Sequence, residues 1–349
     1  MKKYFLSITV CLTAFLLSAP VSQAASIDDP FGYFNVYSLG DINYSGSDFQ
    51  GTTGAAKNVT TSSFTFYNLE SNDYFLHAGE TVSITGGSHL GSVESGSNMT
   101  LNNIGIQGNV YSGGSISGNG GSIYGNAYAT GSYSLPVSTI KAPGTGAYTG
   151  QPYNPAVDLG VVSNYFSDFS NTVAGWGNTG SIAHNGFGAW TINASTGVNV
   201  FSIGALDLFN AHTFNVIGAL DATVYINVTG GGAQSLNSTT WKFQGVSASD
   251  VLLNYSEATS LSMSGGNIIN ILAPDTDIDF SSGVLTGNLI AGNLGGHGQV
   301  NLGHFDKEIP MVVSMSSNAV PEPGTMLLLG AGFIVLIRLD IRKNNKIVS

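Results

Sequence analysis

The sequence predicts a mainly β protein: a right-handed parallel β-helix-like solenoid with one α-helix packed on its flank, plus an apolar helix at the C-terminus. Three observations lead to this prediction. Short segments that alternate polar and apolar residues, broken by glycine, fill residues 34–134, as half-buried strands do. A 17-residue repeat runs through the same region. A single amphipathic stripe with helical spacing interrupts the β-type pattern.

The repeat is clearest where residues 106–115 align with residues 123–132, an offset of 17. A further step back finds residues 91–97 in the same frame, and residues 287–291 repeat its Gly-Asn-apolar core. A short repeat with glycine turns is typical of a solenoid coil. We therefore expect the small residues Ser112, Ala129 and Ala291 to stack inward in one column. The alternative is chance matching within a chain rich in glycine and serine.

One helix is expected at about residues 155–174. Asn154 is a suitable N-cap, and Pro155 suits the first helical position. Apolar residues then follow at spacings of three and four: Leu159, Val162, Phe166, Phe169 and Val173. We expect this stripe to be buried against the side of the β-structure.

The N-terminus has the pattern of a secretory signal peptide over residues 1–24. Lys2 and Lys3 precede an apolar run, and small residues stand where a signal peptidase reads the chain. We therefore expect export by the Sec route and cleavage between Ala24 and Ala25. Cys11, the only cysteine, lies in this segment, so residues 25–349 carry no thiol chemistry.

The C-terminal segment, 320–349, predicts a short transmembrane helix. Its parts are the motif Val320, Pro321, Glu322, Pro323, an uncharged run from Met326 to Ile337, and the basic residues Arg338, Arg342 and Lys343. The run has 12 residues, fewer than the roughly 20 that span a bilayer comfortably. The basic end predicts a cytoplasmic terminus, with the rest of the chain outside.

This order of parts resembles a PEP-CTERM sorting signal. The resemblance covers about 27 residues at the end of the chain, and Asp340 within the basic cluster departs from it. It implies processing by an exosortase in a Gram-negative bacterium that makes exopolysaccharide. The implied route passes through the inner membrane and ends at the cell surface or in the extracellular matrix.

The intervening body, residues 25–319, is acidic and poor in charge. It holds four lysines, no arginine and 19 acidic residues, a net charge of −15. A surface of this sign repels nucleic acid, which excludes that class of partner.

The body resembles a choice-of-anchor A domain. The residues that carry the resemblance are grouped in short segments: 34–36, 40–41, 47–51, 251–255, 271–275, 287–291 and 303–305. The sequence departs from the family pattern after Gly51. The resemblance implies a surface domain that is not an enzyme, with a β-helix and a helix alongside, similar to ice-binding adhesins.

Candidate binding residues are few. Asp275, Asp277 and Asp279 alternate, so on a strand their carboxylates would share one side, where they could bind Ca²⁺ or simply keep an exposed face soluble. The spacing of His297 and His304 argues against a shared metal. Several aromatic residues could stack on sugars or on neighbouring coils: Tyr111, Tyr124, Tyr128, Trp176, Trp190 and Trp241.

Three functions remain open. The first is a non-catalytic structural or adhesive protein of an exopolysaccharide matrix, with a surface glycan as possible partner. The second is a carbohydrate- or ice-binding adhesin module, although the sequence offers no regular Thr-x-Thr column. The third is a polysaccharide-degrading enzyme, which the scattered lysines and the lack of a nucleophile with a suitable base make remote.

Overall fold

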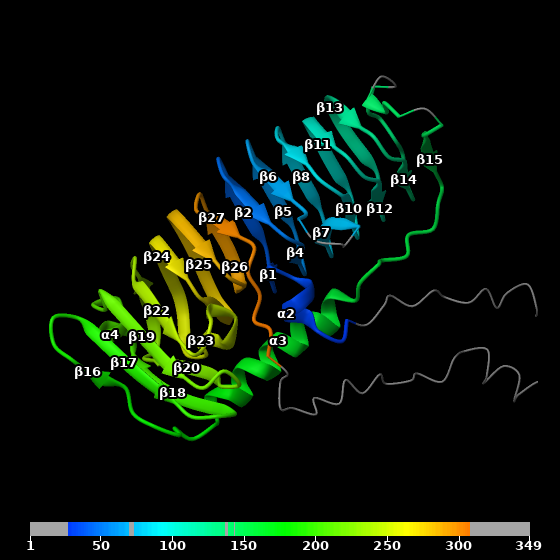
Figure 1. Ribbon diagram of the computed structural model, residues 1–349. Helices are drawn as coiled ribbons and strands as arrows, with labels where there is room; N and C mark the ends of the chain where they lie inside the picture. Colours follow the sequence, from blue (N-terminus) through cyan, green and yellow to red (C-terminus); the bar gives the residue numbers. More distant parts are fainter. Residues whose placement is uncertain (1–26, 70–72, 137–138, 143, 308–349) are drawn as a thin grey trace, which may run out of the picture. The chain divides into compact units, whose positions relative to one another are not determined.

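The computed structural model describes residues 27–69, 73–136, 139–142 and 144–307 (Figure 1). They belong to one compact unit, which spans Ala24–Met311. Short parallel strands dominate, and 23 of them form one continuous sheet that coils into a solenoid. The predicted mainly β, β-helix-like fold is confirmed, while its right-handed sense stays a prediction.

The solenoid has three faces, here called faces A, B and C. Face A contains β1 (Val36–Ser38), β4 (Thr53–Ala55), β7 (Tyr74–Ala78), β10 (Ser92–Ser95), β12 (Val110–Ser112), β14 (Ala127–Ala129), β15 (Ala147–Thr149), β18 (Val198–Gly204), β20 (Thr223–Thr229), β23 (Val251–Asn254) and the first parts of β25 (Asn270–Thr286) and β26 (Leu289–Gly296). Face B contains β2 (Ile42–Ser45), β5 (Val59–Ser62), β8 (Val82–Thr85), β21 (Gly232–Leu236), the first parts of β11 (Met99–Ile106), β13 (Ile116–Ile123) and β24 (Ala258–Ile268), and later parts of β25 and β26. Face C contains β3 (Asp48–Gln50), β6 (Thr65–Tyr67), β9 (Ser88–His89), β27 (Gln299–Asn301) and the last parts of β11, β13, β24 and β25. A separate four-stranded sheet contains β16 (Ala183–His184), β17 (Ala189–Ala194), β19 (Thr213–Gly218) and β22 (Thr240–Gln244).

The chain enters the solenoid in its middle. On one side of β1, Val36 lies opposite Thr53 of β4; on the other side it lies opposite Leu289 of β26. The first half of the chain builds coils from β1 out to β15, and the second half builds from β18 back to β26 and β27 (Figure 1). Segments that are far apart in sequence therefore pair at a seam between β1 and β26.

The 17-residue repeat corresponds to one coil. Val93 of β10 pairs with Val110 of β12, which pairs with Ala127 of β14. The expected inward column is confirmed, because Ser112, Ala129 and Ala291 are all buried and lie in one series of paired small residues. The full series is Ala273, Ala291, Ser38, Ala55, Ala78, Ser95, Ser112 and Ala129.

The predicted helix forms as α3 (Leu159–Ala174), but it starts later than expected. Asp158, not Asn154, is the N-cap, and its carboxylate accepts hydrogen bonds from the backbone of Gly160 and Val161. A carboxylate that accepts two otherwise unpaired N–H groups at the positive end of the helix dipole favours this start over one at Pro155. The apolar stripe of α3 packs on face A, where the Tyr37 hydroxyl donates to the Leu159 carbonyl at 2.7 Å.

Three short helical segments lie between the strands or before the first of them. They are α2 (Pro30–Tyr33), α4 (Ala205–Phe209) and the 3₁₀ turn η2 (Ala248–Asp250). Phe31 of α2 lies edge-on to Phe166 and Phe169 of α3 and to Phe305 near the end of the described chain. Aromatic pairs of this geometry add to the stability that burial alone provides, so this cluster joins both chain ends to the helix.

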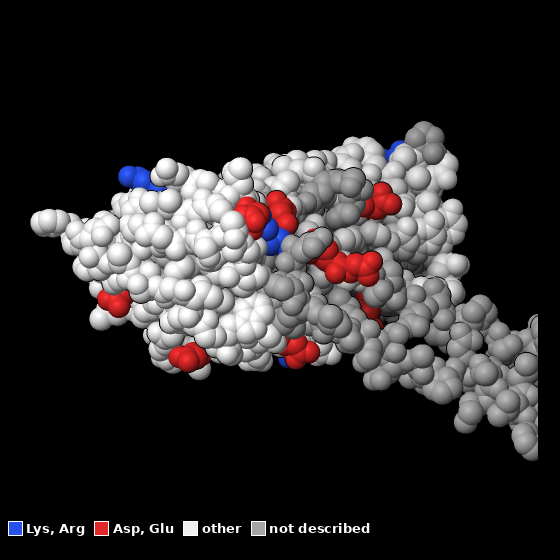
Figure 2. Space-filling view, turned by 60° about the horizontal axis from the view of Figure 1, so that its bottom comes forward, with Lys and Arg blue, Asp and Glu red and all other residues white. Residues whose placement is uncertain are grey.

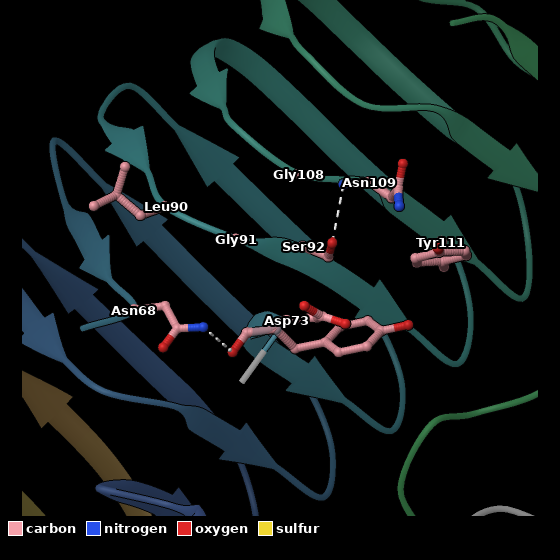
Figure 3. Close-up of a pocket in the computed structure, with 9 residues that line it drawn as sticks. Asn68, Asp73, Leu90, Gly91, Ser92, Gly108, Asn109 and Tyr111 are labelled. Atoms are coloured by element: carbon pink, nitrogen blue, oxygen red, sulfur yellow. Dashed lines mark hydrogen bonds between the residues drawn. The ribbon is translucent and has the colours of Figure 1, made fainter. Parts of the chain in front are cut away.

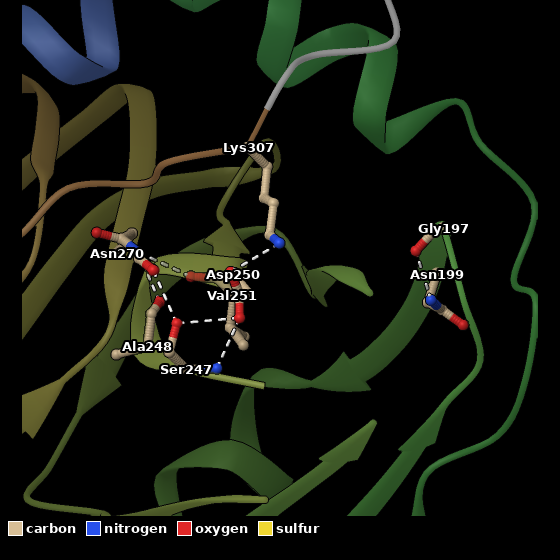
Figure 4. A network of polar contacts seen from close by, with 9 residues as sticks. Gly197, Asn199, Ser247, Ala248, Asp250, Val251, Asn270 and Lys307 are labelled. Carbon is tan, nitrogen blue, oxygen red and sulfur yellow. Dashed lines mark hydrogen bonds and ion pairs between the residues drawn. The ribbon is translucent and has the colours of Figure 1, made fainter. Parts of the chain in front are cut away.

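The last described residue, Lys307, is fixed by Asp250 (Figure 4). The two charged groups lie 3.0 Å apart and are largely shielded from solvent. The other carboxylate oxygen of Asp250 accepts from the backbone and hydroxyl of Ser247, which completes a capping box on η2. In the part of the chain described, no helix is long and apolar enough to cross a membrane. The predicted C-terminal apolar helix lies outside that part.

Candidate functional site: a flat polar face

Face B alternates between mostly apolar residues inside and mostly polar residues outside. In β5, Val59 and Thr61 are buried while Thr60 and Ser62 are exposed. This alternation follows from the two-residue period of a strand, which sends successive side chains to opposite sides of a sheet. Most coils of face B therefore present short polar side chains to solvent.

Because the coils stack in register, these side chains line up in two columns. The first column is Asn43, Thr60, Ser83, Thr100 and Ser117. The second is Ser45, Ser62, Thr85, Asn102 and Asn119. Neighbours in a column are separated by one strand spacing, about 4.8 Å. Serine, threonine and asparagine share these positions, which is why a search for Thr-x-Thr alone does not find them.

The first column crosses the seam and continues into the second half of the chain. Gly295 lies opposite Asn43 and also opposite Asp279. Beyond Asp279, the column reaches Ser262 and Ser235. The polar face thus extends over coils from both halves, although no single stretch of sequence contains it.

A ladder of hydrogen bonds fixes the border between faces A and B across the seam. The Asn293 amide donates to Asp277 at 2.7 Å, and its oxygen accepts from the backbone of Asp41 at 2.8 Å. Asn58 donates to the Asp41 carboxylate at 3.0 Å and accepts from the Thr81 hydroxyl at 2.6 Å. Since each side chain binds the next coil, the ladder holds the coils in the register that aligns the two columns.

The chemistry of face B suits an extended polar ligand. Hydroxyl and amide groups each donate and accept hydrogen bonds, so the columns can bind a hydroxyl-rich chain in either direction. Short side chains also lose little conformational entropy when they become ordered on binding. The wider surface is sparsely charged: Figure 2 shows one side of the body, where acidic groups are scattered over a mostly uncharged surface.

The three aspartates considered for Ca²⁺ are all exposed and lie along β25. Asp275 sits at the corner between faces A and B, where the pairing register shifts, while Asp277 and Asp279 are on face B. Among the residues described, no group of three or more His, Cys, Asp or Glu side chains is placed to hold a metal ion. The Asp277 carboxylate instead takes part in the ladder with Asn293.

The two histidines considered for metal binding have separate surroundings. His297 contacts Ser45 across the seam at 2.9 Å, and His304 contacts the Phe31 carbonyl at 3.0 Å. The imidazoles therefore serve different contacts between the first and second halves of the chain.

The aromatic residues considered for sugar stacking fall into two groups. Trp241 is buried against Phe214, Trp176 lies edge-on to Tyr225, and Trp190 stacks on His184. Tyr111 and Tyr128 stack on each other outside face A, in a row that Tyr148 continues, while Tyr124 is exposed by itself. Trp241 is therefore structural, while Trp176, Trp190 and the tyrosines outside the core are partly exposed.

The sequence analysis missed a buried cluster of hydrogen-bonded polar side chains on face A. His77 and Glu94 approach to 2.7 Å, with side chains 0% and 2% exposed. The Tyr33 hydroxyl contacts the other His77 nitrogen at 3.0 Å, and the backbone N–H of Ala156 donates to Glu94. These contacts join α2, β7, β10 and the segment before α3. The offset of 17 between His77 and Glu94 is the signal that places them on adjacent coils.

Comparison with known families agrees with this architecture. Residues 27–302 match the model of the putative ice-binding-like adhesive domain, and the chain belongs to that family. Residues 319–343 match the PEP-CTERM protein-sorting motif, which confirms the predicted sorting signal and implies export to the surface or exterior of the cell.

A comparison with curated proteins finds no match. Among solved structures, the chain is similar to an ice binding protein from an Antarctic bacterium of the Flavobacteriaceae. The identity is 10%, the match covers 84% of each chain, and the TM-score is 0.28.

The terminal residues assigned to sorting and cleavage lie outside the described part of the chain. They are Ala24, Ala25, Val320, Pro321, Glu322, Pro323, Met326, Ile337, Arg338, Arg342 and Lys343. The sorting-motif match includes the residues from Val320 to Lys343, while the roles of single residues stay predictions.

Proposed function

We propose that this protein is a non-catalytic adhesive of the cell surface or extracellular matrix, and that face B is its binding surface. The observation that carries the proposal is the double column of short polar side chains, which repeats once per coil and crosses the seam. Such an array offers many weak, equivalent hydrogen bonds to a long polymer. An adhesive benefits from this arrangement because many weak contacts made together bind strongly.

The partner we propose for face B is an exopolysaccharide. Polysaccharide chains present hydroxyl groups at regular intervals, and the columns present matching donors and acceptors. Binding to a polymer also agrees with the sorting motif, which implies processing by an exosortase. We further propose that the protein is exported by the Sec route in a Gram-negative bacterium and stays briefly in the inner membrane. We also propose that its body is a choice-of-anchor A domain.

Cosedimentation with exopolysaccharide isolated from the producing strain tests this function. Ser83→Tyr with Thr100→Tyr places bulky uncharged side chains on face B. It is expected to raise the apparent Kd from cosedimentation at least about tenfold, the loss of about 1.4 kcal/mol of binding free energy. The matched control, Thr65→Tyr with Ser122→Tyr, makes the same changes on face C and should bind like the natural chain. Equal binding by both variants would rule out face B as the adhesive surface.

Ice is the second candidate ligand, and the regular spacing of the two columns favours it. An array repeated at about 4.8 Å can hold surface water in an ordered layer. The test is the growth of single ice crystals in the presence of the natural chain and of the face B variant. If the natural chain arrests crystal growth and the face B variant does not, the result favours ice over polysaccharide as the ligand of face B.

A further inference from the structure

A second polar site lies on the corner where face C leads into face A, away from face B (Figure 3). It is a hollow of about 440 Å³ whose walls include Asn68, Asp73, Tyr74, Ser92, Asn109 and Tyr111. A hollow of this size lies within the range of small-ligand sites. We call it the corner hollow.

The floor of the corner hollow is bare backbone. Gly91 has φ +105°, a conformation that residues with a side chain rarely adopt. A Cβ added to Gly108 would come within 2.4 Å of the Gly91 backbone. The two glycines allow adjacent coils to pack closely here, and they leave space above the backbone where side chains would otherwise stand.

The polar groups around this floor are held in place by one another. The Ser92 hydroxyl accepts from the Asn109 backbone at 3.0 Å, and the Asn109 side chain accepts from the backbone of Asn126 at 2.8 Å. The rings of Tyr74 and Tyr111 lie beside each other, with centroids 5.9 Å apart and planes tilted by 40°. A site whose groups are already oriented loses less entropy when a ligand binds.

Among the described residues in the wall of the corner hollow, Asp73 is the one with a charged side chain. It is exposed, and within the described chain its carboxylate has no hydrogen-bond partner. A lone carboxylate with no cation beside it disfavours an anionic ligand, because like charges repel. It is instead well suited to accept hydrogen bonds from two neighbouring hydroxyl groups.

A row of tyrosines leads from the corner hollow along the outside of face A. Tyr111 stacks on Tyr128 with ring centres 5.1 Å apart, and Tyr128 stacks on Tyr148 at 5.2 Å. The ring edges and hydroxyls of this row provide an amphipathic border, to which the C–H and O–H groups of a sugar chain are complementary. A ligand longer than one sugar would therefore continue from the hollow along the row.

We propose that the corner hollow binds one uncharged hexopyranose unit of a polysaccharide, with Asp73 accepting from its hydroxyls and the Tyr111 row holding the units that follow. The proposal deepens the adhesive function and rests on it only in naming a glycan as ligand. Face B would supply broad adhesion to a polymer surface, and the corner hollow would recognise the type of sugar.

Binding of soluble oligosaccharides to the full-length chain, measured by calorimetry, tests the proposal. The probes are the neutral hexamers of β-1,4-glucose, β-1,4-mannose and β-1,4-galactose, with oligogalacturonate as the acidic comparison. We expect at least one neutral hexamer to bind and oligogalacturonate not to bind. Asp73→Asn should weaken the neutral hexamer about tenfold or more, because it removes the charge from a hydrogen-bond acceptor.

The matched control is Asp168→Asn, on the exposed side of α3, which should bind like the natural chain. Tyr128→Ala should weaken the hexamer more than the corresponding disaccharide, because only the longer ligand reaches the row. The proposal is overturned if no neutral hexamer binds, if Asp73→Asn binds as well as the natural chain, or if the acidic oligomer binds more tightly.

The same variants distinguish this proposal from the adhesive function of face B. Asp73→Asn should keep its cosedimentation with isolated exopolysaccharide, while Ser83→Tyr with Thr100→Tyr should keep hexamer binding. If no hexamer binds but cosedimentation still depends on face B, the proposal for the corner hollow is contradicted and the adhesive function of face B stands. If the face B variant cosediments like the natural chain while hexamers still bind, the adhesive function of face B is contradicted and the proposal for the corner hollow stands.

Discussion

His89 is a residue whose ionisation the fold changes strongly. It is fully buried on face C, where it stacks on Phe75 and accepts a hydrogen bond from the Phe66 backbone. Burial lowers its pKa from 6.5 to about 4. The folded imidazole is therefore half protonated only near pH 4 and is mostly neutral above about pH 5.

This pKa shift predicts a loss of stability in mild acid. Between pH 6.5 and about 4, the unfolded chain binds a proton at His89 that the folded chain does not. The free energy of unfolding should therefore fall as pH decreases through this window, by about 3 kcal/mol at most. His89→Asn keeps an acceptor for Phe66 but cannot titrate, so its denaturation midpoint should depend less on pH. His212→Asn, at an exposed site, should retain the natural profile; parallel profiles for all three chains would disprove the assignment.

The second prediction for single residues concerns how much the contact between His77 and Glu94 contributes to the free energy of unfolding. Removing one member of this buried hydrogen-bonded pair leaves the other without its partner, which costs about 1–3 kcal/mol. Glu94→Ala should lower the free energy of unfolding by about that amount in urea denaturation. Glu80→Ala, at an exposed acidic residue just after β7, should change the free energy of unfolding by less than about 0.5 kcal/mol. Equal effects of the two substitutions would contradict a stabilising role for the pair.

At the level of single residues, the sequence predicts inward positions better than outward ones. The small inward residues Ser112 and Ala129 share a visible repeat, because the interior admits only small side chains in that column. Outward positions such as Ser83, Thr100 and Ser117 also follow the 17-residue offset, but solvent accepts serine, threonine or asparagine equally. Their residue type varies, and the column becomes evident only once strand pairing is known.

At the scale of elements, α3 is joined to face A by a buried polar network. The Ser170 hydroxyl donates to Asn254 at 2.6 Å, and the Asn254 amide donates to the Ser170 carbonyl and to Asn227. Asn227 in turn donates to the Val173 carbonyl in the last turn of α3. A buried network in which each partner is satisfied fixes the position of the helix as well as its stability.

Removing Asn254 should therefore loosen α3. Asn254→Ala leaves the Ser170 and Asn227 side chains partly unpaired in the interior, which predicts a loss of about 3 kcal/mol in unfolding free energy. The measurement is urea denaturation combined with the rate of limited proteolysis within 159–180. Asn193→Ala, at an exposed position of β17, provides the comparison and should alter neither. An unchanged proteolysis rate in Asn254→Ala would show that the apolar stripe alone holds the helix.

The sequence predicted this helix and its buried stripe, but placed its start at Pro155. Proline and asparagine are permitted at several positions around a helix start, so sequence preference alone does not choose among them. The choice depends on the tertiary contacts of the preceding segment, where Ala156 donates to Glu94. That contact holds the backbone outside the helix until Asp158.

At the scale of the whole molecule, the seam makes two distant halves of the sequence into one surface. Pairing of β1 with β26 and of β2 with β26 aligns the outward columns of face B across the seam. The repeat predicted a solenoid, but it could not predict that the chain enters in the middle. The repeat indicates which consecutive coils stack on each other, whereas the order of all the coils depends on pairing between strands far apart in the sequence.

The most direct test of the central claim is protection of a single thiol by the polymer. In a Cys11→Ser background, Ser83→Cys places a thiol on face B and Ser122→Cys places one on face C, at sites of similar partial exposure. The rate of maleimide alkylation is measured with and without isolated exopolysaccharide. The account predicts that the polymer slows alkylation at Ser83→Cys several-fold and leaves Ser122→Cys unchanged. Protection at Ser122→Cys alone, or equal rates at both sites with the polymer bound, would contradict it.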